Sequence, residues 1–417
     1  MKLKRVVITG LGALTPIGNN VNDFWKNLIQ GKSGIAEITK FDASPFKTKF
    51  AGELKGFDPL LFMEKAQARK MDSYSQYAVA VVDECIKDSN IDLKNTDLSK
   101  VGVIWGTGIG GIETFEKEII EYGANLDSPR FSPFFATKMI SNMAAGNISI
   151  HYGFRGVSYV TASACASSNN AIINAYNNIQ LGKANVIFAG GSEASITPAG
   201  IGGFSSMKAI SQRNESPETA SRPFDVSRDG FVLAEGAGVI MLEELEHAKN
   251  RGAKIYGEIA GGGCASDAYH IAAPHPEGIG AVAAMTEAIN EAGLLPEDVD
   301  YVSTHGTATP IGDLSECKAI VTVFENSLDK LHISATKSMT GHLLGAAGAI
   351  EAIACIKSIN TGIVPPTSNL NEIDPAIDKR INLTPNVAVT KTVNVALNNT
   401  FGFGGHIFVS LFKKYKE

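Results

Sequence analysis

Residues 157–176, VSYVTASACASSNNAIINAY, change character twice. A β-branched and aromatic run at 157–161 gives way to small residues, and apolar positions at helical spacing follow. The pattern predicts a strand, a turn and a helix, with Cys165 at the turn. The N–H groups and dipole of a helix N-terminus stabilise a thiolate, and the flanking Ala and Ser residues leave room for a substrate. We interpret Cys165 as a candidate nucleophile, and the alternative is an inert buried cysteine.

Short apolar runs alternate with longer amphipathic segments along the whole chain. The first series predicts strands at 6–9, 101–105, 157–161, 186–189 and 239–242, with helices near 24–30, 73–89, 144–152 and 171–181. The second predicts strands at 255–260, 301–304, 332–335, 393–397 and 407–412, with helices near 278–292, 314–324 and 346–359. Such alternation is typical of layered α/β proteins.

The two series echo one another weakly. Residues 229–242 and 400–411 share one pattern, a Gly-rich turn that leads into an apolar strand. We therefore expect two related halves, 1–254 with the nucleophile and 255–417 with two candidate histidines. No low-complexity linker separates them, so the halves are expected to pack as one body.

Two further segments place histidines in turns. VSTHGTATPIGD (302–313) ends a predicted strand on His305, and HISATKSMTGHLLGAAG (332–348) carries Lys337 and His342. A lone histidine is usually a satisfied polar residue. Two histidines in Gly/Thr-rich turns, in a chain that also offers Cys165 at a turn, form a candidate nucleophile and base set.

Composition limits the class of protein. The formal net charge of −6 argues against a general nucleic-acid surface. The five cysteines are far apart in the sequence and have no CxxC spacing. This pattern indicates a protein of the reducing cytoplasm that contains neither disulfides nor structural zinc. Residues 1–8 imitate a signal peptide, but Thr9 and Gly10 break the apolar run, so a first strand is expected. No membrane span is expected either, because charges interrupt the apolar stretch after Gly341.

A dinucleotide-binding loop is one alternative, suggested by Gly10-Leu11-Gly12 after a strand. The third glycine of that fingerprint is missing, and no acidic residue ends a strand at the usual distance. The sequence therefore disfavours nicotinamide binding.

With these motifs, the chain resembles the β-ketoacyl-acyl carrier protein synthases, condensing enzymes of the thiolase superfamily, and among them the elongating type II group. The resemblance runs from residues 6–12 to 399–405, with Cys165, His-Gly-Thr-x-Thr, Lys-x-x-x-Gly-His and Gly-Phe-Gly-Gly in that order. It implies a duplicated thiolase-like α/β fold in five layers, α-β-α-β-α. The implied reaction is decarboxylative condensation of an acyl carrier protein (ACP) thioester with malonyl-ACP. A cytoplasmic homodimer with ACP as partner and no cofactor or metal is also implied.

The resemblance assigns roles to the candidate residues. Cys165 would carry the acyl group, and its backbone N–H and that of Phe403 would form an oxyanion hole. His305 and His342 would stabilise the enolate of the malonyl thioester, while Lys337 and Glu351 would support the charge balance of the substrate site. Phe403 would be a gate whose glycine neighbours let the backbone reorient. The alternative for Gly402-Phe403-Gly404-Gly405 is a tight turn before the last strand.

The resemblance also suggests contacts to the substrate and to ACP. Thr307 and Thr309 would bond the phosphopantetheine arm. Ile109 would line the far acyl pocket, and Phe134 and Phe135 would enter a partner subunit's pocket, which points to medium or long acyl chains. The expected docking surface for the acidic ACP consists of Lys65, Arg69, Lys70, Lys208 and Arg213. An ordinary solvated face is the alternative for these basic residues.

Three departures from the family pattern lie near the expected site: Thr304 in place of Ala, Ala272 in place of Thr, and the pair His406-Ile407. They leave open a ketosynthase of a polyketide or aryl-polyene pathway. A non-catalytic chain-length factor is disfavoured because such proteins lack the nucleophilic cysteine that this chain has.

Overall fold

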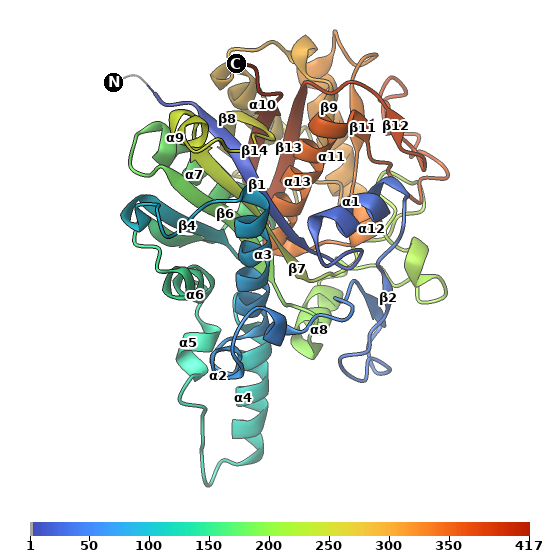
Figure 1. The fold of residues 1–417 in the computed structure, drawn as a ribbon. Coiled ribbons are helices and arrows are strands. Elements are labelled where there is room, and N and C mark those ends of the chain that lie inside the picture. The colour runs from blue at the N-terminus through green and yellow to red at the C-terminus, as the bar shows by residue number, and fades with distance from the viewer. Residues whose placement is uncertain (1–2) are drawn as a thin grey trace.

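The computed structural model describes residues 3–417 (Figure 1). The first series of strands comprises β1 (Val6–Leu14), β4 (Val101–Gly106), β5 (Ser158–Thr161), β6 (Val186–Glu193) and β7 (Gly236–Glu244). The second comprises β8 (Gly257–Ser266), β9 (Tyr301–Ser303), β10 (His332–Ser334), β13 (Val395–Gly402) and β14 (His406–Lys413). All ten predicted strands are therefore present. Residues 1–2 of the predicted N-terminal segment lie outside the described range.

The strand order repeats in the two halves. The ten strands form one sheet in the order β10-β9-β13-β14-β8-β1-β7-β6-β4-β5. Within each series the order is third, second, fourth, fifth, first, and the parallel and antiparallel pairings also match. The halves join through three residue pairs of β1 and β8. The duplication that the sequence hinted at is therefore plain in the topology, and the predicted division at residue 254 falls between β7 and β8.

Helices form three layers around the two halves of the sheet. The central layer is α7 (Ser167–Gln180) with α13 (Ala347–Thr361), and each of these helices contacts strands of both halves. On the outer faces, α3 (Ser73–Ser89) and α6 (Met143–Tyr152) cover the first half, and α10 (Ile279–Glu291) and α11 (Pro310–Phe324) cover the second. The predicted α-β-α-β-α arrangement is confirmed.

The central layer holds the largest core. Ile172 and Ala175 of α7 lie in the same buried cluster as Ile350 and Ile353 of α13. Each fully buried isoleucine side chain contributes roughly 1.5–3 kcal/mol relative to an exposed one. This shared core fixes the first turns of α7 and α13 against one another.

The remaining helices are shorter or peripheral: α1 (Val21–Ile29), α2 (Lys65–Ala68), α4 (Ile112–Ala124), α5 (Phe135–Met139), α8 (Pro198–Ser206), α9 (Leu245–Asn250) and α12 (Lys337–Thr340). Two small antiparallel sheets of two strands each pair β2 (Ala36–Glu37) with β3 (Phe50–Ala51) and β11 (Ile363–Val364) with β12 (Val389–Thr390). Figure 1 shows α4 and α5 projecting from the body of the molecule. Within residues 3–417, no helix has the length and apolar character needed to cross a membrane.

Candidate active site

One cavity of about 320 Å³ brings the sequence-predicted residues of both halves together. Cys165, His305, His342 and Phe403 line it. Thr307 and Thr309 lie in the same wall. The first half therefore supplies the thiol and the second half supplies the histidines.

Cys165 lies on a strained turn at the start of the central helix. The 3-10 turn η3 (Ala164–Ala166) joins α7, and Ala164 has φ +51°, a left-handed value that is uncommon outside glycine. Cys165 is 8% exposed. Burial raises the pKa of the Cys165 thiol to about 12, and the nearby Lys337 charge opposes that rise. Burial therefore opposes the thiolate that the helix N-terminus is expected to stabilise.

His305 is held by a buried carboxylate. The N–H groups of His305 and Gly306 donate to the two oxygens of Glu316, each at 2.9 Å. Asn399 Nδ2 donates to the same carboxylate at 3.2 Å. Burial raises the pKa of Glu316 to about 7, and the backbone N–H donors oppose the rise. Glu316 on α11 thus fixes the loop that follows β9.

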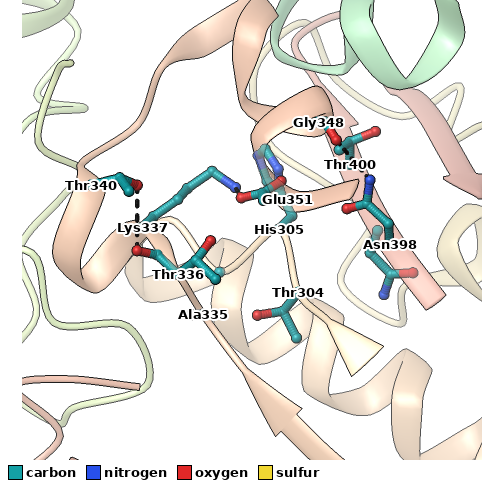
Figure 2. A network of polar contacts seen from close by, with 12 residues as sticks. Thr304, His305, Ala335, Thr336, Lys337, Thr340, Gly348, Glu351, Asn398 and Thr400 are labelled. Atoms are coloured by element: carbon teal, nitrogen blue, oxygen red, sulfur yellow. Dashed lines mark hydrogen bonds and ion pairs between the residues drawn. The ribbon is translucent and has the colours of Figure 1, made fainter. Parts of the chain in front are cut away.

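His342 is anchored through its backbone. Its N–H donates to the Val232 carbonyl at 2.7 Å, and its own carbonyl accepts from Ala234 at 3.0 Å. Five residues earlier, Lys337 makes a buried ion pair with Glu351 of α13, and Figure 2 shows the two side chains pointing toward one another. Lys337 therefore places a paired cation close to both histidines.

The two imidazoles lie edge to face, with ring centroids 5.3 Å apart and an interplanar angle of 87°. Burial holds the pKa of His305 well below its usual range, and the charge of Lys337 adds to this effect. The pKa of His342 is lowered in the same way. Both rings are therefore neutral near pH 7, and each has one N–H donor and one acceptor nitrogen. The Nδ1 atoms of both are buried without a hydrogen-bond partner within residues 3–417.

Phe403 forms part of the cavity wall above Cys165. Its ring centroid is 6.5 Å from that of Phe204. Gly404 and Gly405 have φ values of +87° and +78°, whereas Gly402 does not adopt a left-handed φ. A Cβ atom at Gly402 would instead lie 2.3 Å from the Ser163 carbonyl oxygen. The absence of a Cβ atom at Gly402 thus allows the strand to approach the nucleophile turn, and the expected gate motion of Phe403 stays a prediction.

Comparisons with known proteins agree with this geometry. Residues 3–248 match the family model for the beta-ketoacyl synthase N-terminal domain, and residues 256–371 match that for the C-terminal domain. The chain belongs to the beta-ketoacyl synthase family. A relative from Synechocystis sp., a 3-oxoacyl-[acyl-carrier-protein] synthase 2, is 45% identical over 419 residues, which covers 100% of this chain and 99% of the relative.

Solved structures give the same result. The ishigamide ketosynthase/chain length factor superposes with a TM-score of 0.93 at 31% identity, covering 99% of this chain and 100% of the other. A type II polyketide ketosynthase in complex with its acyl-carrier protein superposes with a TM-score of 0.91 at 30% identity, with the same coverage. The expected family and acyltransferase class of this synthase are thereby confirmed.

The departures from the family pattern also lie at the site of this synthase. Ala272, His406 and Ile407 line the cavity. Thr304 is fully buried behind His305, and its hydroxyl donates to the Ser334 carbonyl at 3.0 Å. Thr304 therefore ties the ends of β9 and β10 and does not reach the substrate space.

Two predicted substrate contacts lie away from the cavity. Ile109 is 40% exposed, and its N–H donates to Glu193. Phe135 begins α5 and stacks on Phe115 and Phe131. Neither residue lines the cavity, so their expected contacts with an acyl chain stay predictions.

The expected docking residues differ in their exposure to solvent and in their ion pairing. Lys65, Arg69 and Lys70 are exposed on and just after α2, and the Lys70 ammonium lies 5.7 Å from the Phe134 ring centroid. Lys208 is exposed at the cavity mouth. Arg213 is half-buried and paired with Asp229 at 3.6 Å. An internally paired arginine attracts a partner less, so Arg213 contributes least to a basic surface.

Two buried carboxylates were missed from the sequence. Glu193 at the end of β6 accepts the N–H groups of Gly108, Ile109 and Gly345, and Glu316 holds His305 as described. Each lies inside a regular element without a motif around it. A lone acid in an otherwise apolar strand, as in 186–193, was the one available signal.

The glycines that suggested a dinucleotide site belong to a buried strand. Residues 3–417 contain no group of three His, Cys, Asp or Glu side chains placed to hold a metal ion. Gly10 and Gly12 lie inside β1, where a Cβ atom at Gly12 would come within 2.1 Å of the Val81 carbonyl oxygen. Those glycines serve helix-on-sheet packing and do not form a loop that could cradle a pyrophosphate.

Proposed function

We propose that this synthase lengthens acyl chains by condensing an acyl-ACP with malonyl-ACP to give 3-oxoacyl-ACP, in fatty-acid elongation. The observation that carries the proposal is the meeting of Cys165, His305 and His342 at one cavity. A thiol, two neutral imidazoles and a paired cation are what this reaction requires, and no cofactor is needed for it.

The first half-reaction loads Cys165. The Cys165 sulfur attacks the thioester carbonyl of acyl-ACP, its proton passes to an acceptor nitrogen of the neighbouring imidazoles, and the ACP thiol leaves with a proton. In residues 3–417 no turn or loop hydrogen bond between backbone groups uses the N–H of Cys165 or Phe403. We assign these two donors to the oxyanion of the tetrahedral intermediate.

The second half-reaction forms the carbon–carbon bond. The malonyl carboxylate leaves as carbon dioxide, and the electrons of the broken carbon–carbon bond form an enolate. The enolate oxygen accepts hydrogen bonds from ring N–H groups of His305 and His342. The enolate carbon then attacks the acyl-Cys165 carbonyl, and the Cys165 sulfur leaves as a thiolate that takes up a proton from solvent to restore the thiol. Lowered pKa values keep both imidazoles neutral, so they act as hydrogen-bond donors without a permanent charge.

The carrier arm would enter from the mouth beside Lys208. The hydroxyls of Thr307 and Thr309, 3.1 Å apart, are placed to bond the amides of a phosphopantetheine arm. Lys65, Arg69, Lys70 and Lys208 offer positive charge to an acidic ACP.

We also infer a homodimer. Large apolar side chains are exposed on one contiguous stretch of chain: Phe115, Ile119, Ile120, Tyr122, Leu126, Phe131, Phe134, Ile140, Ile150 and Tyr159. Phe131 stacks on Tyr122, and Phe115 and Phe131 both stack on Phe135, so part of this set forms one exposed apolar patch of the kind that marks an interface. The sheet also has an open edge at β5, whereas the equivalent edge at β10 is covered where the Ile333 N–H donates to Asn382. A cytoplasmic location is inferred from the five free cysteines.

The alternative pathway, a ketosynthase of polyketide or aryl-polyene synthesis, is favoured by the structural relatives and by the apolar Ala272 and Ile407 in the cavity wall. Higher identity to the 3-oxoacyl-[acyl-carrier-protein] synthase 2 relative favours fatty-acid elongation.

The test is product analysis. Purified protein is incubated with saturated acyl-ACPs of graded length and malonyl-ACP, and ACP-bound products are measured by mass spectrometry. We expect a single two-carbon extension as 3-oxoacyl-ACP, together with one carbon dioxide. Repeated extension without ketoreduction would support the polyketide alternative, and the absence of any condensation would contradict the proposal.

A further inference from the structure

Strand β13 touches the nucleophile turn at two points, one on each side of Cys165 in the sequence. On the first side, Gly402 lies against the Ser163 carbonyl, as its 2.3 Å Cβ clearance shows. On the second side, four residues after Cys165, Asn169 reaches the same strand. Phe403 follows Gly402 directly, so these two contacts set how the Cys165 backbone faces the Phe403 backbone.

Asn169 is fully buried, and both ends of its amide are bonded. Its Nδ2 lies 3.1 Å from the Asn398 carbonyl, 3.1 Å from Thr400 Oγ1 and 3.0 Å from the Phe408 carbonyl. Its Oδ1 accepts from Ser410 Oγ at 2.7 Å. The side chain therefore links the first turn of α7 to both β13 and β14. Burying a polar amide is unfavourable unless it is bonded in this way, and these bonds have strict geometry.

The same network reaches the other central helix. Asn398 Nδ2 donates to the Gly348 carbonyl at 2.8 Å, and Figure 2 shows Gly348, Asn398 and Thr400. A Cβ atom at Gly348 would come within 2.9 Å of the Asn169 Cβ. The amide thus lies where the two central helices and the last two strands meet.

The duplicated half shows that the fold does not require an amide here. The turn Leu344–Ala346 is the equivalent of Ala164–Ala166, and the residue four positions after Gly345 is Ala349, which has no side-chain donor or acceptor. The helix α13 nevertheless begins in the same manner as α7. The polar link is confined to the half that carries the thiol.

We propose that Asn169 is a positioning residue that aligns the backbone N–H of Cys165 with that of Phe403, and thereby sets the rate of acyl transfer to Cys165. This inference rests on the proposed function. Misalignment of reacting groups by about 1 Å can cost on the order of a hundredfold in rate. Simple alkylation of the thiol by iodoacetamide needs no oxyanion hole, so it provides a readout that misalignment leaves unchanged.

The experiment compares two rates at Cys165 in the full chain. Single-turnover acylation by acyl-ACP is followed by mass spectrometry, and iodoacetamide alkylation is measured at the same pH. For Asn169→Val we expect acylation to be at least about tenfold slower, while alkylation stays within about twofold of the parent. Asn177→Val, an exposed asparagine on the same helix, is the matched control and should change neither rate.

Two further variants separate alignment from stability. Ser410→Ala removes one partner only and serves where Asn169→Val does not fold; it should slow acylation more than alkylation. Asn169→Val combined with Ser410→Ala also removes the hydroxyl that Asn169→Val leaves without its acceptor, which recovers part of the stability without restoring the link, so acylation should remain slow. Unchanged acylation in the folded variants, equal loss of both rates, or recovery of acylation in the double variant would overturn the inference. Absence of acylation in the parent would instead contradict the proposed function.

Discussion

The turn at Cys165 and the turn at Gly345 are the same structure used twice. Both are 3-10 turns that run into a central helix, and both begin with a left-handed residue, Ala164 at φ +51° and Leu344 at φ +46°. They differ in the residue at the middle position. Cys165 faces the cavity, whereas a Cβ atom at Gly345 would lie 2.3 Å from the Gly108 nitrogen.

The difference shows how a duplicated fold divides its labour. The Gly345 N–H donates to Glu193 at 3.0 Å, and the same carboxylate accepts the N–H groups of Gly108 and Ile109. The second turn is therefore closed against the loop after β4. The second half instead contributes its chemistry from the segments that end on His305 and His342, so one turn keeps the reactive position and the other braces it.

The largest expected effect is at the reactive turn. Cys165→Ala should abolish both condensation and the acyl-enzyme while the protein stays folded. Cys165→Gln should differ, because the side-chain carbonyl can occupy the oxyanion hole and imitate the acylated state. We expect it to decarboxylate malonyl-ACP without extending a chain. Release of carbon dioxide and formation of 3-oxoacyl-ACP are the two measurements, and condensation by the Ala variant would contradict the assignment.

The second comparison concerns the histidines. His305→Ala and His342→Ala should each lower malonyl-ACP decarboxylation by about a hundredfold or more, and acylation of Cys165 should fall less. The double variant should be little worse than the poorer single variant, because the two rings act on one enolate. Rapid-quench assays of the two half-reactions check this. Equal loss of both would argue against the division between the two halves.

The third prediction tests the turn Leu344–Ala346. Gly345→Ala should destabilise the fold by about 1–3 kcal/mol or more, because the added methyl group meets backbone. Cys165→Ala removes a thiol and adds no clash, so its thermal midpoint should stay near that of the parent. Thermal unfolding of both variants gives the contrast. A Gly345→Ala protein as stable as the parent would show that the two turns are not packed as described.

Substitution of Gly402 tests the contact between β13 and the nucleophile turn, and its expected effect is smaller than those above. Gly402→Val should slow acylation with a long-chain primer because its side chain meets the Ser163 carbonyl and shifts the strand that leads to Phe403. Circular dichroism verifies that the fold is retained. Turnover equal to that of the parent would show that Phe403 and its turn have no role in acylation.

The smallest effect is a pH dependence of stability. Burial raises the pKa of Glu316 to about 7, above the value of about 4.3 for an exposed glutamate. The folded state binds this proton more tightly, so its contribution is complete below the unfolded pKa and is lost as the pH rises through about 7. Denaturant unfolding at pH 5 and pH 8 should show a smaller loss of stability for Glu316→Gln than for the parent. The same pH slope in both proteins would contradict this assignment.

Much of the fold could be predicted from the sequence. Runs of β-branched residues marked all ten main strands, and the periodicity of 73–89 marked α3. Helix α4 could also have been predicted from the helical spacing of Ile112, Phe115 and Ile119. Helix α8 could not, because its sequence PAGIGGFSS contains three glycines, so tertiary packing and the Thr197 cap decide it.

For the candidate site, too, some features could be predicted from the sequence and others could not. Local motifs marked Cys165, His305, His342 and Lys337, because each lies in a turn with a distinctive composition. The raised pKa of the Cys165 thiol could not be predicted, since it depends on burial by segments far away in the sequence. Glu316 and Asn169 were missed for a similar reason, because the groups they bond come from other elements.

The central claim is that Cys165 alone carries the acyl group. The direct measurement is peptide mass spectrometry of the protein after incubation with a panel of acyl-ACP thioesters and rapid acid quench, with the other four cysteines as internal controls. The account predicts one acyl group per chain, on the peptide that contains Cys165, and none on Cys85, Cys264, Cys317 or Cys355. An acyl group on another cysteine, or condensation without any acyl-enzyme, would contradict it.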